Sequence, residues 1–118
     1  MSKLPEPSTP LTPSMFHVLL ALAGEDMHGY AILKDVELRT DGEVKLSTGT
    51  LYGIIKRLLN DGLIIERRER PSAANDDERR RYYRLTATGR KVARAEAERL
   101  AGWLRVARAK KILRGDHV

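Results

Sequence analysis

The sequence predicts a mainly α-helical fold with a small β-hairpin and a long C-terminal helix. Three observations support this prediction. Apolar residues recur at helical spacing between residues 51 and 59, two short segments rich in β-branched and aromatic residues flank a polar linker, and a stretch rich in Ala and Arg runs on to residue 113. A chain of 118 residues accommodates one such domain with one appendage.

The N-terminal part of the chain predicts a tail followed by a short buried helix. Residues 1–12 hold three of the five prolines and no periodic apolar residues, which is typical of a tail. Thr12 and Pro13 suit the N-cap and the first position of a helix. The following segment is apolar nearly all round and ends at Gly24, so we expect a buried helix there.

Two further helices are expected, separated by a charged loop over residues 39–46. The second helix is expected from about His28 to Leu38, and Ser47 supplies a side-chain cap for the third, which ends at Asn60. The third helix has two distinct faces. Its apolar stripe consists of Leu51, Ile54, Ile55, Leu58 and Leu59, and its polar face carries Thr48, Tyr52 and Lys56.

The next segment predicts two strands, over residues 63–69 and 80–85. The polar linker 70–79 joins them into a hairpin, and alternation places Tyr83 and Leu85 on its inner face.

A closing helix is expected from a cap at Thr86 to Leu113. Some 25 residues at 1.5 Å each make a rod of roughly 38 Å, which is longer than so small a domain is wide. Its apolar stripe consists of Leu100, Trp103, Leu104 and Ala107. Because the rest of the chain leaves nothing to cover this stripe, we expect a homodimer in which the stripe forms the interface.

The net charge of +6 is distributed unevenly along the chain. Residues 1–46 carry a net charge of −3, whereas residues 47–91 carry +5 and residues 92–118 carry +4. Segregated positive charge favours a polyanionic partner such as nucleic acid, although many basic proteins bind none.

Composition excludes several classes of protein. The chain has no cysteine, hence no disulfide or thiolate metal site, and no apolar window long enough to predict a transmembrane helix. With only His17, His28 and His117 as histidines we expect no metal site and no cofactor. The sequence also lacks a Ser-His-Asp set and a glycine-rich phosphate loop, so we do not expect an enzyme. The N-terminus lacks the apolar core of a signal peptide, so we expect a cytoplasmic protein.

Three helices, a hairpin and a closing helix are the element order of a winged helix-turn-helix. The major groove of DNA admits one α-helix, and a hairpin beside it reaches the flanking backbone or the minor groove. We therefore expect a winged helix-turn-helix DNA-binding domain over residues 13–86, a dimerisation helix over 87–113 and a short tail over 114–118.

Three blocks of sequence resemble the PadR family of bacterial transcriptional regulators. They are HGYAILKDV at 28–36, LSTGTLYGIIKRLLNDGLI at 46–64 and RRYYRLTATGR at 80–90, in the family's order and spacing. The resemblance covers about residues 14–113 and fits the short members with one C-terminal dimerisation helix. It implies a repressor that binds an inverted-repeat operator and releases it when a small molecule or another signal arrives.

DNA contacts are expected from the third helix and from the base of the wing. Hydroxyls and free amides at a helix N-terminus suit phosphates or base edges, although Ser47 also suits simple capping. The resemblance implies that Tyr52 faces DNA, and the alternative is that it supports the adjoining helix. The wing tip, residues 76–78, is acidic and repels phosphates, which favours the arginines at the base of the wing. The candidate DNA-binding residues are Ser47, Thr48, Thr50, Tyr52, Lys56, Arg80, Arg81 and Tyr30.

Trp103 admits two interpretations. It either anchors the dimer interface or lines an effector pocket between protomers, as the resemblance to short family members implies. Counted from Gly89, it lies about one helical turn later than the tryptophan of those members. For the whole protein, the alternative to a regulator with a pseudo-palindromic operator is an adaptor that binds another protein without DNA.

Overall fold

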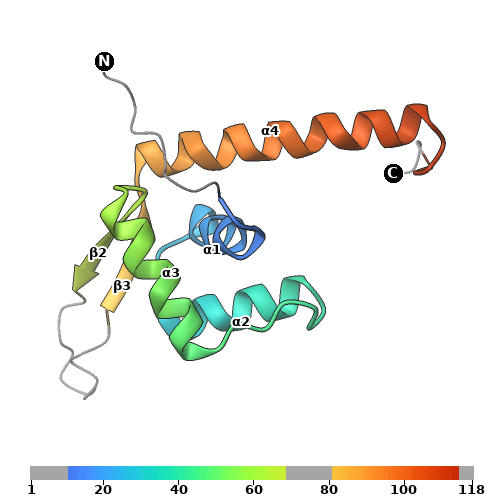
Figure 1. The fold of residues 1–118 in the computed structure, drawn as a ribbon. Helices are drawn as coiled ribbons and strands as arrows, with labels where there is room; N and C mark the ends of the chain where they lie inside the picture. The colour runs from blue at the N-terminus through green and yellow to red at the C-terminus, as the bar shows by residue number, and fades with distance from the viewer. Residues whose placement is uncertain (1–10, 69–80, 115–118) are drawn as a thin grey trace.

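The computed structural model describes residues 11–68 and 81–114, and it has the expected mainly α-helical architecture (Figure 1). Four helices and three short strands make up this part of the chain. They are α1 (Pro13–Gly24), β1 (Met27–His28), α2 (Gly29–Arg39), α3 (Thr48–Asn60), β2 (Ile64–Arg68), β3 (Arg81–Leu85) and α4 (Ala87–Ala109). The predicted linker 70–79 and most of the two predicted tails lie outside the described residues.

Each helix begins at a side chain that accepts a hydrogen bond from its first turn. Thr12, Ser47 and Thr86 do so at the predicted positions, with hydroxyl oxygens 3.1, 3.0 and 2.9 Å from the donor nitrogens. α2 differs from the prediction, because His28 is its N-cap: the backbone N–H of Ala31 donates to the ring nitrogen Nδ1 at 3.3 Å. Such caps satisfy amides that have no acceptor inside the helix.

The sheet has three strands where the sequence predicted two. Met27 and His28 of β1 pair with Tyr83 and Tyr82, and the strand order is β1-β3-β2. β1 escapes prediction because two residues are too few to show an alternating pattern. The His28 ring also meets the Tyr82 ring edge-on, with centroids 5.3 Å apart. His28 thus belongs to the sheet and caps α2 at the same time.

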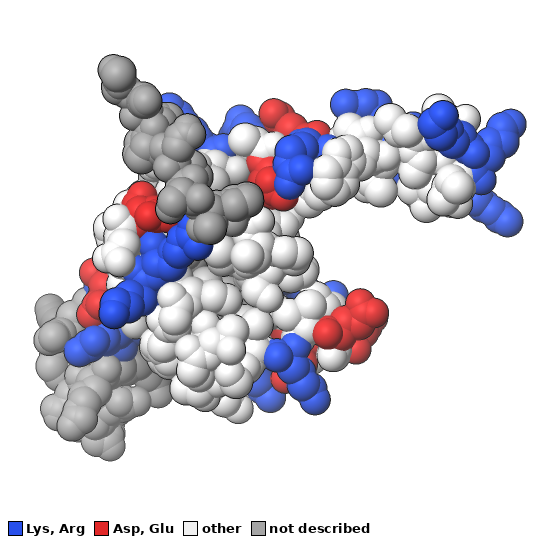
Figure 2. Space-filling model, in the orientation of Figure 1, with Lys and Arg blue, Asp and Glu red and all other residues white. Residues whose placement is uncertain are grey.

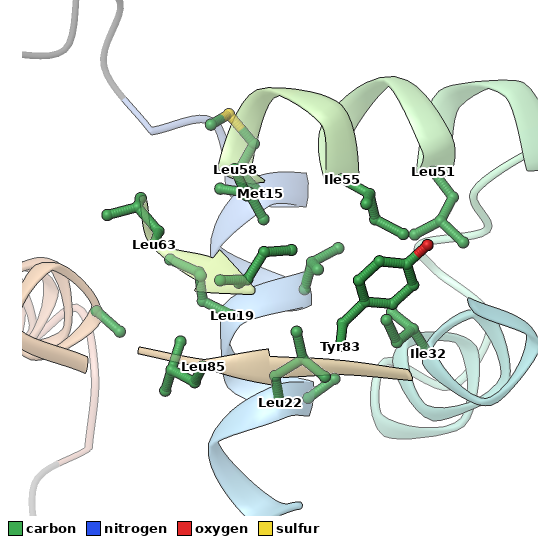
Figure 3. Close-up of a cluster of buried hydrophobic side chains, with 14 of the residues drawn as sticks. Met15, Leu19, Leu22, Ile32, Leu51, Ile55, Leu58, Leu63, Tyr83 and Leu85 are labelled. Atoms are coloured by element: carbon green, nitrogen blue, oxygen red, sulfur yellow. The ribbon is translucent and has the colours of Figure 1, made fainter. Parts of the chain in front are cut away.

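The core lies between α1, α2, α3 and the inner face of the sheet (Figure 3). Its largest fully buried side chains are Val18, Leu19, Ile32, Val36, Leu51, Leu58 and Ile64. Tyr83 and Leu85 point inward from β3, as predicted. The predicted stripe of α3 is confirmed, with Ile54 and Leu59 half-buried at its edges. Burial of this stripe holds α3 with its polar face outward.

α4 ends at Ala109, four residues before the predicted end. Lys111 has a left-handed φ of 65°, and its N–H donates to the carbonyl of Arg108 at 3.0 Å. The N–H of Ile112 donates to the carbonyl of Ala107 at 2.9 Å, which completes a Schellman motif. Glycine usually occupies the left-handed position of this motif, so Lys111 gives no stop signal in the sequence.

Most of α4 extends away from the domain (Figure 1). Gly89 and Ala93, in its first two turns, are its only buried residues. A Cβ atom on Gly89 would overlap the backbone carbonyl of Leu63, the residue before β2, so the backbone of the helix lies directly against the backbone of that residue. This close contact fixes the direction in which α4 leaves the domain.

Arg39 joins α1 to α2 at the surface. Its guanidinium donates to the backbone carbonyl of His17 at 3.0 Å and lies 3.5 Å from Nδ1 of the same residue, while its Nε pairs with Asp35 at 2.8 Å. Burial lowers the pKa of His17 below its ordinary value of 6.5, and the positive charge of Arg39 lowers it further. The folded state therefore favours neutral His17.

Acidification is expected to weaken the fold through His17. Its proton binds more readily in the unfolded chain, so its stabilising contribution is complete above pH 6.5 and is lost as the pH falls through the lower folded-state pKa. Urea unfolding of the wild type and His17→Gln between about pH 7.5 and about pH 5 measures this effect. The variant should lose less stability than the wild type. Parallel curves for the two proteins would contradict the role of His17.

Candidate nucleic-acid interface

The polar face of α3 is exposed as predicted. Thr48, Thr50, Tyr52 and Lys56 all lie at the surface, because the opposite face of the helix is held in the core. Figure 2 shows basic side chains over the region where Figure 1 places α3 and the strands. Lys56 also borders a shallow hollow, which is lined by Gly53, Lys56, Arg57, Asn60 and Asp61. The helix thus offers hydroxyls at its N-terminus and cations further along.

Ser47 is occupied with capping. Its hydroxyl oxygen accepts the N–H of Thr50 at 3.0 Å, and its hydroxyl donates to Oγ1 of Thr50 at 2.9 Å. This pair of bonds orients the Thr50 hydroxyl at the first turn of α3.

Tyr52 has a structural contact as well as an exposed surface. Its hydroxyl lies against Gly29, and a Cβ atom at Gly29 would overlap it. The side chain nevertheless remains 46% exposed. Tyr52 therefore supports the start of α2, as the alternative interpretation held, and keeps a face toward solvent. The neighbouring Tyr30 is 63% exposed, with the Lys34 ammonium 5.7 Å from its ring centre.

The wing arginines form ion pairs that the sequence did not reveal. Arg81 pairs with Glu66 on β2 at 3.3 Å, whereas Arg80 lies outside the described residues. Arg67 and Arg84 both pair with Asp26, which precedes β1, at 3.2 and 3.1 Å. These partners are 41 and 58 residues apart in sequence, so only the folded sheet brings them together.

Tyr83 on β3 is the register partner of Glu66 on β2. Burial raises the pKa of the Tyr83 hydroxyl, and the Glu66 carboxylate and Tyr52 raise it further. Glu66 therefore lies beside Tyr83, on a strand that packs against α3.

The predicted dimer stripe on α4 is exposed in the single chain. Trp103 is 58% and Leu104 47% exposed, while Leu100 and Ala107 are half-buried. The Arg99 guanidinium covers one side of the Trp103 ring at 4.7 Å and makes two hydrogen bonds to Glu96, of 2.6 and 3.1 Å. Val106 on α4 and Ile112, just beyond the end of the helix, are also exposed apolar side chains.

Two negative findings concern the described residues. Within 11–68 and 81–114, no three histidine, aspartate or glutamate side chains come together as metal ligands would. In the same ranges, no helix combines the length and the apolar character needed to span a bilayer.

Comparison with known proteins places this fold. A transcriptional regulator from Clostridium thermocellum has a TM-score of 0.67 at 27% identity, over 80% of this chain and 86% of that chain. A PadR family transcription regulator from Clostridium difficile has a TM-score of 0.67 at 25% identity, over 80% and 94%. A third structure is Bacillus subtilis PadR in complex with operator DNA, which has a TM-score of 0.62. It is 17% identical over 73% of this chain and 48% of that chain, so it shows similarity of fold alone.

Comparison of the sequence gave one match to a family and none to an individual curated protein. The model of the transcriptional regulator PadR-like family matches residues 18–95, which is well over half of the chain and includes α2, α3, the sheet and the start of α4. With its winged helix-turn-helix and this match, the chain belongs to the PadR-like family of transcriptional regulators.

Proposed function

We propose that the protein is a sequence-specific regulator that binds double-stranded DNA as a homodimer. It represses transcription in the cytoplasm until a small-molecule effector releases it from a pseudo-palindromic operator, and it has no catalytic role. The observation that carries this proposal is the exposed polar face of α3, which is held outward by a buried apolar stripe and flanked by a wing. The solved complex of Bacillus subtilis PadR with operator DNA supports it by analogy of fold.

α3 is the proposed reading helix. Its 13 residues span about 20 Å, which suits the major groove, and its first turns present Thr48, Thr50 and Tyr52 for bases or adjacent phosphates. Lys56 neutralises a phosphate one turn further on. Arg81, together with Arg80, holds the flanking backbone from the base of the wing, and Tyr30 places its hydroxyl near a phosphate.

The exposed stripe of α4 is the proposed dimer interface. Two copies that pair through Trp103 and Leu104 cover large apolar side chains that the single chain leaves in water. The twofold axis of such a dimer places two copies of α3 on half-sites separated by about one helical turn or a multiple of it. The effector is proposed to bind near Trp103, where Arg99 now covers one side of the ring.

Replacing Lys56 by Ala is expected to weaken binding to every duplex tested by about threefold to tenfold, because each protomer loses one phosphate contact. The slope of log K against log salt should become shallower by about one unit per protomer. Fluorescence anisotropy with the DNA upstream of the protein's own gene and with a random-sequence duplex, over a salt series, measures both quantities.

The matched control is Lys91→Ala on α4, which removes the same charge at an exposed position away from α3. It should leave affinity within about twofold of the wild type. Wild-type binding that ignores salt, or no DNA binding at all, would favour an adaptor instead of a DNA-binding regulator.

A further inference from the structure

Every wing arginine whose side chain the structure describes is paired with a carboxylate. Arg81 on β3 pairs with Glu66 on β2, across the inner face of the hairpin. Arg67 and Arg84 lie on the outer face and share the Asp26 carboxylate. Two acidic side chains therefore hold three cations, and the local net charge is lower than the arginine-rich sequence of the wing suggests.

The pairs are accessible and exchangeable. The three guanidinium groups are about half exposed, and the carboxylates of Glu66 and Asp26 are about one-third exposed. Ion pairs at this level of exposure contribute little to stability, because water and salt screen them. A phosphate can therefore take the place of a carboxylate, but only by displacing it.

The positions of Glu66 and Asp26 in the fold are also relevant to contacts with phosphates. Glu66 on β2 is the register partner of Tyr83 on β3, and β2 packs against α3. Asp26 stands directly before β1, whose last residue caps α2. Glu66 thus lies on a strand that packs against α3, and Asp26 precedes the strand that leads into α2, whose Tyr30 is a proposed DNA contact.

We propose that Glu66 and Asp26 compete with DNA phosphates for the wing arginines and thereby restrain sequence-independent binding. This inference rests on the proposed function. Base contacts from α3 need no ion pair to break, whereas a phosphate contact from Arg67, Arg81 or Arg84 has to break an existing ion pair first. The restraint therefore lowers affinity for all DNA and leaves discrimination between sequences to α3.

Neutralising either carboxylate should strengthen binding to DNA of any sequence. Glu66→Gln and Asp26→Asn keep the side-chain shape while they remove the charge. Each variant is expected to bind a random-sequence duplex about three to ten times more tightly than the wild type, with a steeper dependence on salt, because freed arginines release counterions when they meet phosphates.

The matched control is Asp35→Asn on α2. Asp35 pairs with Arg39 in the same way, so the substitution raises the net charge equally without freeing a wing arginine. It should change affinity by less than about twofold. Equal affinities for Glu66→Gln, Asp26→Asn and Asp35→Asn, or weaker binding by the first two, would overturn the inference.

A second comparison separates the ion pair from any change in folding. In the Arg81→Gln background, Glu66→Gln should bring no gain in affinity, because the cation that Glu66 restrains is absent. A gain that persists there would overturn the pairing mechanism. If the wild type binds no duplex at any salt concentration, the proposed function itself fails, which is a result distinct from wild-type binding without an effect of these substitutions.

Discussion

Replacing Gly89 by Ala is expected to lower the free energy of unfolding by about 2–3 kcal/mol. The added methyl group would overlap the backbone carbonyl of Leu63 and also meet the Leu85 side chain, so the start of α4 has to move away from both residues. Backbone cannot yield as a flexible side chain does. Urea denaturation at one fixed protein concentration measures the change, which should appear in the midpoint.

Gly53→Ala is the matched control for this substitution. A Cβ at Gly53 meets nothing within 4 Å, so alanine should stabilise α3 by about 0.5–1 kcal/mol through its higher helix propensity. The two variants change the same atoms and should move in opposite directions. A Gly89→Ala protein as stable as the wild type would contradict the close packing of Gly89 against Leu63 and Leu85.

Replacing both Trp103 and Leu104 by Ala is expected to raise the dissociation constant of the dimer by about 100-fold to 1000-fold. Large apolar side chains at the centre of an interface account for most of its binding energy, and each of these two should contribute about 2 kcal/mol. Operator affinity should fall as well, because a monomer can contact only one half-site of the operator and binds it weakly. Sedimentation over a concentration series measures the dissociation constant directly.

The control for the dimer is Leu38→Ala on α2. Leu38 is highly exposed and apolar, but it stands outside the α4 stripe. Its loss should leave the dissociation constant unchanged within about twofold. A wild type that sediments as a monomer at micromolar concentration would refute the proposed interface before any variant is made.

The helices could be predicted because their signals are local. The caps at Thr12, Ser47 and Thr86 and the apolar stripe of α3 depend on residues within a few positions of each other, and the structure confirms them. β1 is too short to carry a pattern, and its pairing with β3 comes from the tertiary fold. The end of α4 was placed too late, because a lysine occupies the left-handed position.

The candidate site also combines features that residue spacing predicts with features that only the folded structure reveals. Helical spacing alone predicts that Thr48, Tyr52 and Lys56 share an exposed face. The support that Tyr52 gives to α2 and the pairing of Arg81 with Glu66 depend on how elements pack and on strand register, which residue spacing does not specify. Sequence reasoning therefore found the cations of the wing and missed the carboxylates that hold them.

His28 connects the hairpin mechanically to α2. Its backbone pairs with Tyr82 of the wing, its ring rests on the same residue, and its Nδ1 holds the first turn of α2. A tilt of the wing therefore has to break the pairing with β1, break the cap or carry the start of α2 along. Since Gly29 in that first turn touches Tyr52, a displacement of the hairpin is transmitted to α3 through only a few residues.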